Sequence, residues 1–145
     1  MNEKEPRIKV LIKKPYQEIE EVEIDNELKT LQEIVGGLIQ IVPFPTVKGV
    51  DLIINEEGKL ESLDGNFFMP HYEDCTVGNA IMASHDEEGN LASISDKQKK
   101  KVKEYIDTFQ LNEGEDLYRG FHILNHLMKE KQKVFDKKLK DGEMA

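Results

Sequence analysis

The sequence predicts an α+β fold, in which one helix packs across a mostly antiparallel sheet of about five to seven strands and a helical pair follows at the C-terminal end. Three observations support this prediction. Apolar and polar residues alternate along several short segments, a period typical of half-buried strands. One short helical pattern, Asn26 to Val35, lies between strand patterns. Two longer helical patterns follow Ser95.

The length of 145 residues fits a single domain, with an α+β core over residues 7–94 and C-terminal helices over residues 95–140. Hydrophobic residues make up 38% of the chain and charged residues 34%, which indicates a globular protein with a strongly charged surface. No run of about 18 apolar residues could span a membrane. The N-terminal segment has no apolar signal core, and the single cysteine, Cys75, permits no internal disulfide. We therefore expect a cytoplasmic protein without membrane contact.

The first segments of the chain predict a β-β-α-β start. Residues 7–13 and 19–24 alternate between apolar and polar, which predicts two half-buried strands. An apolar stripe at helical spacing over residues 26–35 predicts a helix packed on the sheet. Asp25 or Asn26 is the expected N-cap, because its short polar side chain can accept a hydrogen bond from a free backbone N–H.

A double glycine, Gly36-Gly37, follows this helix. Phosphate-binding loops place their glycines before a helix, so we interpret these two as a helix stop. Leu38 to Val42 is a near-continuous apolar run, which predicts a strand in the interior of the sheet. Val50 to Ile54 predicts a further apolar strand.

The second half of the chain begins with its densest aromatic cluster, at Phe67 to Met69. Residues 77–84 and 91–94 predict two more strands. Ser95-Asp96-Lys97-Gln98 has the form of a capping box and predicts a helix start. A longer helix is expected from about Glu115 to near Lys140. Such a helix would span about 37 Å, so its far half is expected to pack on another subunit of a homo-oligomer.

Three of these segments together resemble a domain-of-unknown-function family: K-V-L-I-K-K-P, E-I-D-N-x-L-x-x-L-Q-x-I-V-G-G-x-I and D-L-I-I-N-E-E-G-K-L. The resemblance covers about residues 7–107, beyond which this chain adds the long helix. Members of the family occur in bacteriophages, in Gram-positive bacteria and on mobile elements. The resemblance implies a small accessory protein, of the kind that counters host defences by sequestering a signalling nucleotide or by blocking a host protein.

A metal site and an enzyme active site both find little support. His122 and His126 lie four residues apart on the predicted long helix, so both could face one metal ion. No third histidine or nearby acidic residue completes a ligand set, and a surface or interface pair is the alternative that we favour. The serines lack a nucleophile motif, and the many carboxylates single out no catalytic pair. We expect a non-enzymatic protein with no metal and no cofactor.

Cationic groups beside aromatic rings mark three candidate places for a ligand, because anion recognition with base stacking needs these residue types. One place is the turn after the first strand, one adjoins the aromatic cluster, and one lies on the long helix. A solvated turn or an ordinary helix surface is the alternative at each. The candidate ligand-binding residues are Lys13, Lys14, Tyr16, His71, Tyr72, Arg119 and His122.

The formal net charge of −9 argues against general nucleic-acid binding, which needs a basic face. It still permits a small anionic ligand in a local pocket. Our leading hypothesis is a non-enzymatic phage or mobile-element protein that sequesters a small phosphate-bearing signal, such as a host-defence nucleotide. The alternative is an acidic inhibitor, or DNA mimic, that binds a host defence protein.

Overall fold

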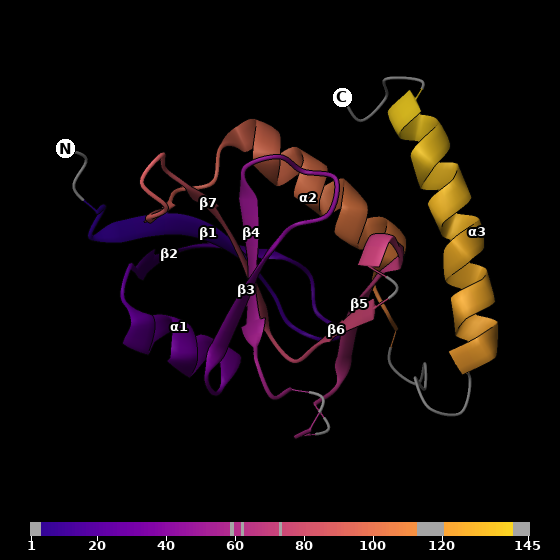
Figure 1. The fold of residues 1–145 in the computed structure, drawn as a ribbon, viewed down its shortest axis with the longest axis horizontal. Coiled ribbons are helices and arrows are strands. Elements are labelled where there is room, and N and C mark those ends of the chain that lie inside the picture. Colours follow the sequence, from indigo (N-terminus) through magenta and orange to yellow (C-terminus); the bar gives the residue numbers. More distant parts are fainter. Residues whose placement is uncertain (1–3, 59, 62, 73, 113–120, 141–145) are drawn as a thin grey trace.

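A computed structural model of the chain describes residues 4–58, 60–61, 63–72, 74–112 and 121–140 (Figure 1). It confirms the predicted α+β class, with a six-stranded sheet, a two-stranded sheet and three α-helices among those residues. The elements in chain order are β1 (Arg7–Lys13), β2 (Glu20–Asp25), α1 (Leu28–Val35), β3 (Ile39–Pro43), β4 (Val50–Asn55), β5 (Gly65–Met69), the 3₁₀ turn η1 (Pro70–Tyr72), β6 (Asp74–Val77), β7 (Ala80–His85), β8 (Leu91–Ala92), α2 (Asp96–Phe109) and α3 (Phe121–Lys140).

The main sheet is antiparallel throughout, with the strand order β2-β1-β7-β4-β3 and the short β8 paired to β7. The strands β5 and β6 form the second sheet. Helices cover the two faces of the main sheet, α1 on one and α2 on the other (Figure 1). Alternation along β1 explains this division, since Ile8, Val10 and Ile12 join the apolar cluster under α1 while Leu11 joins the cluster under α2.

The two predicted ends of α1 had different outcomes. Gly36 has a φ of +84° and ends the helix, as predicted, with its N–H bonded to the carbonyl of Gln32. The predicted N-cap is wrong: Glu27 occupies that position and its side chain makes no capping bond. Asn26 is instead buried, and its amide donates to the carbonyls of Glu5 and Leu91, at 2.9 and 3.1 Å. The Asn26 side chain therefore bonds to segments distant in sequence and does not cap α1.

Two strand predictions also need correction. The apolar run at 38–42 does form a strand, but β3 lies at an edge of the sheet and not in its interior. The expected single strand over 77–84 is divided at Gly78, whose φ of +72° separates β6 from β7. The N–H of Gly78, just after β6, donates to the carbonyl of Asp64, just before β5. This bond closes the open end of the β5–β6 hairpin.

The C-terminal pair packs through aromatic side chains. Phe135 of α3 is 1% exposed and lies against Tyr105 and Phe109 of α2, with ring centroids 5.1 and 5.5 Å away. The predicted helix start near Glu115 falls within 113–120, outside the described residues. That α3 joins two subunits stays a prediction. No helix in the described ranges is both long and apolar enough to cross a membrane.

Candidate functional site

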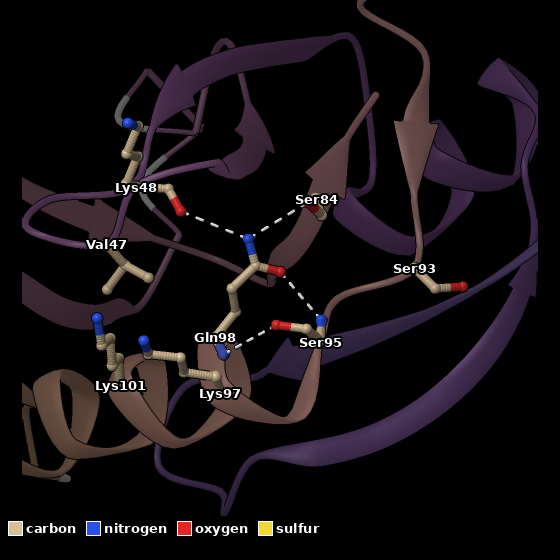
Figure 2. A pocket seen from close by; sticks show the side chains of 8 residues that line it. All are labelled: Val47, Lys48, Ser84, Ser93, Ser95, Lys97, Gln98 and Lys101. Carbon is tan, nitrogen blue, oxygen red and sulfur yellow. Dashed lines mark hydrogen bonds between the residues drawn. The ribbon is translucent and has the colours of Figure 1, made fainter. Parts of the chain in front are cut away.

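A surface cavity of about 560 Å³ lies between the start of α2, the β3–β4 loop and the end of β7. This volume falls in the range of roughly 300–1,000 Å³ that small-molecule sites occupy. Seven of the eight described residues that line the cavity have polar side chains: three lysines, three serines and one glutamine. It is lined by Val47, Lys48, Ser84, Ser93, Ser95, Lys97, Gln98 and Lys101 (Figure 2).

The capping box at the start of α2 fixes one wall of the cavity. The hydroxyl oxygen of Ser95 accepts a hydrogen bond from the Gln98 N–H at 3.1 Å. In return, the Gln98 side-chain oxygen accepts from the Ser95 N–H at 2.9 Å. This confirms the predicted capping box. It also orients the Gln98 amide so that its nitrogen points across the cavity toward the β3–β4 loop (Figure 2).

The same amide holds the loop. The Gln98 Nε2 atom lies 3.4 Å from both the carbonyl oxygen of Lys48 and the hydroxyl of Ser84. The Ser84 hydroxyl donates in turn to the carbonyl of Gly49 at 3.0 Å. Gly49 has a φ of +81°, and a Cβ there would lie 3.1 Å from Gln98 Nε2. The left-handed turn therefore favours glycine, and a larger residue would also crowd the Gln98 amide.

Helix α2 sorts four of its lysines into two pairs, each with the i, i+4 spacing that places side chains on one face. Lys99 and Lys103 face β2, where Glu21 lies 3.2 Å from the first ammonium group and 3.5 Å from the second. Hydrogen bonding to Lys99, together with the charge of Lys103, lowers the pKa of the Glu21 carboxyl. Lys97 and Lys101 face the cavity instead.

The cations that line the cavity have no partner carboxylate in the part of the chain that the structure describes. Within the described residues, Lys48, Lys97 and Lys101 form no ion pair. Figure 2 shows Lys97 and Lys101 extending toward Val47, while the Lys48 side chain extends away from α2. Like charges at i, i+4 cost a helix roughly 0.2–0.5 kcal/mol. In a chain with a net charge of −9, an uncompensated lysine pair therefore stands out as a place for an anion.

The cavity can recognise charge better than it can recognise a base. An anion here would meet ammonium groups, the Ser95 hydroxyl and the positive end of the α2 dipole. The Ser93 hydroxyl is already engaged by the Lys9 N–H at 2.9 Å. Among the described residues, no aromatic side chain lines the cavity, and Val47 is the one apolar residue that does. The predicted combination of ring and cation is therefore not found at this place.

The structure places Lys13, the first of the predicted ligand-binding residues, inside the protein. It is 1% exposed, and its ammonium group donates to the carbonyl of Lys14 at 2.8 Å. Burial lowers the pKa of Lys13, against an opposing effect of the Asp107 charge. Lys13 is therefore not available as a surface cation. Lys14 is half-buried and Tyr16 is exposed on the following turn.

His71 and Tyr72 lie on η1, and both make structural contacts. The Nδ1 atom of His71 is 3.0 Å from the hydroxyl of Tyr105, and Tyr72 donates its hydroxyl to the carbonyl of Pro43 at 2.8 Å. The last two predicted residues, Arg119 and His122, lie outside the residues whose side chains the structure describes, as does His126.

None of the five predicted residues that the structure describes lines the cavity at α2. None lines a second, smaller cavity of about 120 Å³ between β3, β4 and β6. Our sequence reasoning missed the lysines at 97 and 101 because it treated the segment only as a helix start with a buried face. The available signal was the K-Q-K-K-K-V-K run directly behind the capping box.

The fold and the cavity together define an α+β protein with a lysine-lined surface site. A family model described as a domain of unknown function (DUF3846) matches residues 8–110, so the chain belongs to that family. This confirms the resemblance drawn from the sequence. The matched residues end just after α2, and α3 lies beyond them. No curated protein and no solved structure matched the chain in these comparisons.

Proposed function

We propose that this protein is a non-enzymatic binding protein for a small phosphate-bearing molecule, and that the cavity at the start of α2 receives the phosphate. The observation that carries the proposal is the pair Lys97 and Lys101, which share one helix face, line the cavity and have no ion pair among the described residues. Placement at a helix N-terminus supports it further, because the dipole and free N–H groups there favour anions.

The lining favours binding over catalysis. Among the described residues around the cavity there is no carboxylate, imidazole or thiol that could act as a general acid, base or nucleophile. The family resemblance suggests an accessory protein of a phage or mobile element that sequesters a host-defence nucleotide. The absence of an aromatic lining directs this proposal toward the phosphate and sugar of such a ligand, with its base facing solvent or a second subunit.

Calorimetry of the full chain against cyclic oligonucleotides, ADP-ribose derivatives and inorganic phosphate tests the proposal. The variant Lys97→Gln/Lys101→Gln should weaken binding by roughly 10- to 100-fold, since a charge-assisted hydrogen bond contributes about 1.5–3 kcal/mol. Lys99→Gln/Lys103→Gln is the matched control, with the same spacing on the other face of α2, and should bind normally. Equal losses in both variants would mean that only general charge matters, and no binding by the wild type would refute the proposal.

The acidic-inhibitor hypothesis has one supporting observation, the four carboxylates along the exposed edge strand β2. Much of that charge is already neutralised. Arg7 bonds to Glu23 and Asp25, and Glu21 is held by two lysines of α2. A salt-sensitive host complex recovered by pull-down, together with no binding to the nucleotide panel, would favour the inhibitor over the nucleotide-binding protein.

A further inference from the structure

Among the described residues, the strand β3 has a neighbouring strand on one side only. It lies at the edge of the main sheet, with β4 as its neighbour. Just outside the strand, the Glu56 N–H donates to the Leu38 carbonyl at 2.8 Å and the Phe44 N–H donates to the Val50 carbonyl at 2.9 Å. Residues that bond to the same antiparallel neighbour alternate along a strand. The even-numbered residues of β3 therefore bond to β4, and the odd-numbered ones face outward.

The outward backbone groups form a symmetric pattern. Ile39 and Ile41 each direct an N–H and a C=O away from β4. Beyond them, groups on both sides are already committed or missing. Pro43 has no N–H, and its carbonyl accepts the hydroxyl of Tyr72. At the other end, the N–H of Gly37 donates to a carbonyl of α1 at 3.1 Å. The unbonded backbone groups on this side of β3 are therefore centred on Gln40.

The two edges of the sheet differ in how they meet solvent. β2 carries four carboxylates in six residues, and charges of this kind discourage pairing with another strand. β3 carries no charge at all, in a chain of which 34% is charged. Its apolar side chains are also open to solvent, because Leu38 is 57% exposed and Ile41 is 47% exposed. An uncharged, apolar open edge is the usual template for strand addition.

We propose that β3 pairs antiparallel with β3 of a second copy of this chain, with Gln40 on the two-fold axis. In this register Ile39 faces Ile41 of the other copy, which uses all four outward backbone groups of each strand. Pairing ends beyond these residues, because Pro43, which would lie opposite Gly37, has no N–H and its carbonyl accepts from Tyr72, while the Gly37 N–H is bonded within its own chain. The edge is therefore complementary to its own copy in this register.

The side chains agree with the same register. Leu38 faces Val42 of the other copy on the sheet surface below α2, and Ile39 faces Ile41 on the surface below α1. Cross-strand apolar pairs of this kind stabilise antiparallel sheets by roughly 0.2–1 kcal/mol each. The pairing would join the two main sheets into one continuous sheet. The contact is independent of α3 and of the cavity at α2.

Disulfide trapping tests the register. Residues facing each other in a non-hydrogen-bonded pair have Cα atoms about 4.5 Å apart, within the range that a disulfide can bridge. On a Cys75→Ser background, Gln40→Cys should oxidise to a covalent dimer. Leu38→Cys is the matched control, equally exposed to oxidant but distant from its own mate, and should stay uncrosslinked. Crosslinking of both variants to the same extent, or of neither, would overturn the register.

Sedimentation equilibrium tests the contact itself. The wild-type chain should be a dimer, and Ile41→Lys should be a monomer because it would place an ammonium group beside the apolar Ile39 of the other copy at two symmetric positions. Val134→Lys, which charges a 57% exposed apolar residue of α3, should remain a dimer. Circular dichroism of each variant checks that it is folded. A wild-type monomer, or a folded Ile41→Lys that still dimerises, would refute pairing through β3.

Discussion

The Nδ1 atom of His71 lies 3.0 Å from the hydroxyl of Tyr105, and this contact joins η1 to α2 beneath the last helix. The His71 ring also packs against Phe135 of α3, while its Nε2 atom has no hydrogen bond to any described residue and lies 3.5 Å from the Asp136 carboxylate. One side-chain cluster therefore fixes three elements that are distant in sequence. We therefore expect the contacts of this cluster to hold α3 against the rest of the domain.

Alkaline pH should expose the contribution of Tyr105. Burial raises the pKa of its phenol, so the folded state holds a proton that the unfolded chain loses above about pH 10. The stabilisation is complete below that pH and is lost as the pH rises. Tyr105→Phe should lose about 1 kcal/mol at pH 7 and show a shallower alkaline decline in denaturant titrations. An alkaline decline in Tyr105→Phe as steep as that of the wild type would contradict the assignment.

The docking of α3 should depend on one aromatic side chain. Phe135→Ala removes a ring that is 1% exposed, and such truncations cost about 3–5 kcal/mol. We expect faster hydrogen exchange over α3 and a lower melting temperature. Val134→Ala changes the neighbouring, 57% exposed residue and should stay within about 0.5 kcal/mol of the wild type. Similar losses in both variants would show that α3 does not dock through this face.

Features with a local cause could be predicted from the sequence. Gly36 ends its helix because the following turn needs a left-handed residue, and Ser95 starts the next helix because its hydroxyl and Gln98 satisfy each other's backbone groups. The predicted N-cap of α1 was wrong because its cause is not local. Asn26 found stronger partners on segments that are distant in sequence, which no local pattern reveals.

Features that depend on strand order could not be predicted. The apolar run of β3 suggests an interior strand, and only the sheet order places it at an edge. The cavity could not be predicted for the same reason, because Lys48 and Lys97 belong to different segments that both lie beside the end of β7. Lys13 was misplaced for a related reason, since its ammonium group is buried by the packing of elements later in the chain.

Acidic pH should reveal the pair of lysines that faces β2. Hydrogen bonding from Lys99, with the charge of Lys103, lowers the pKa of Glu21 below its unfolded value of about 4.3. Its stabilisation is therefore present above that pH and is lost as the pH falls. Glu21→Gln should flatten the stability profile between about pH 5 and 3. Glu20→Gln, next in the chain but without an ion pair among the described residues, should keep the wild-type slope in the same titration.

Gln98 has two separable roles, and two substitutions distinguish them. Gln98→Ala removes both the capping bond to the Ser95 N–H and the contact with the Lys48 carbonyl, so it should cost about 1–2 kcal/mol in urea titrations. Gln98→Glu keeps a side-chain oxygen for the cap but has no amide donor for the loop, so it should lose less. In the alanine variant the β3–β4 loop is released, and phosphate-ligand affinity should fall although every lysine remains. Unchanged affinity in a folded Gln98→Ala would show that the loop does not shape the site.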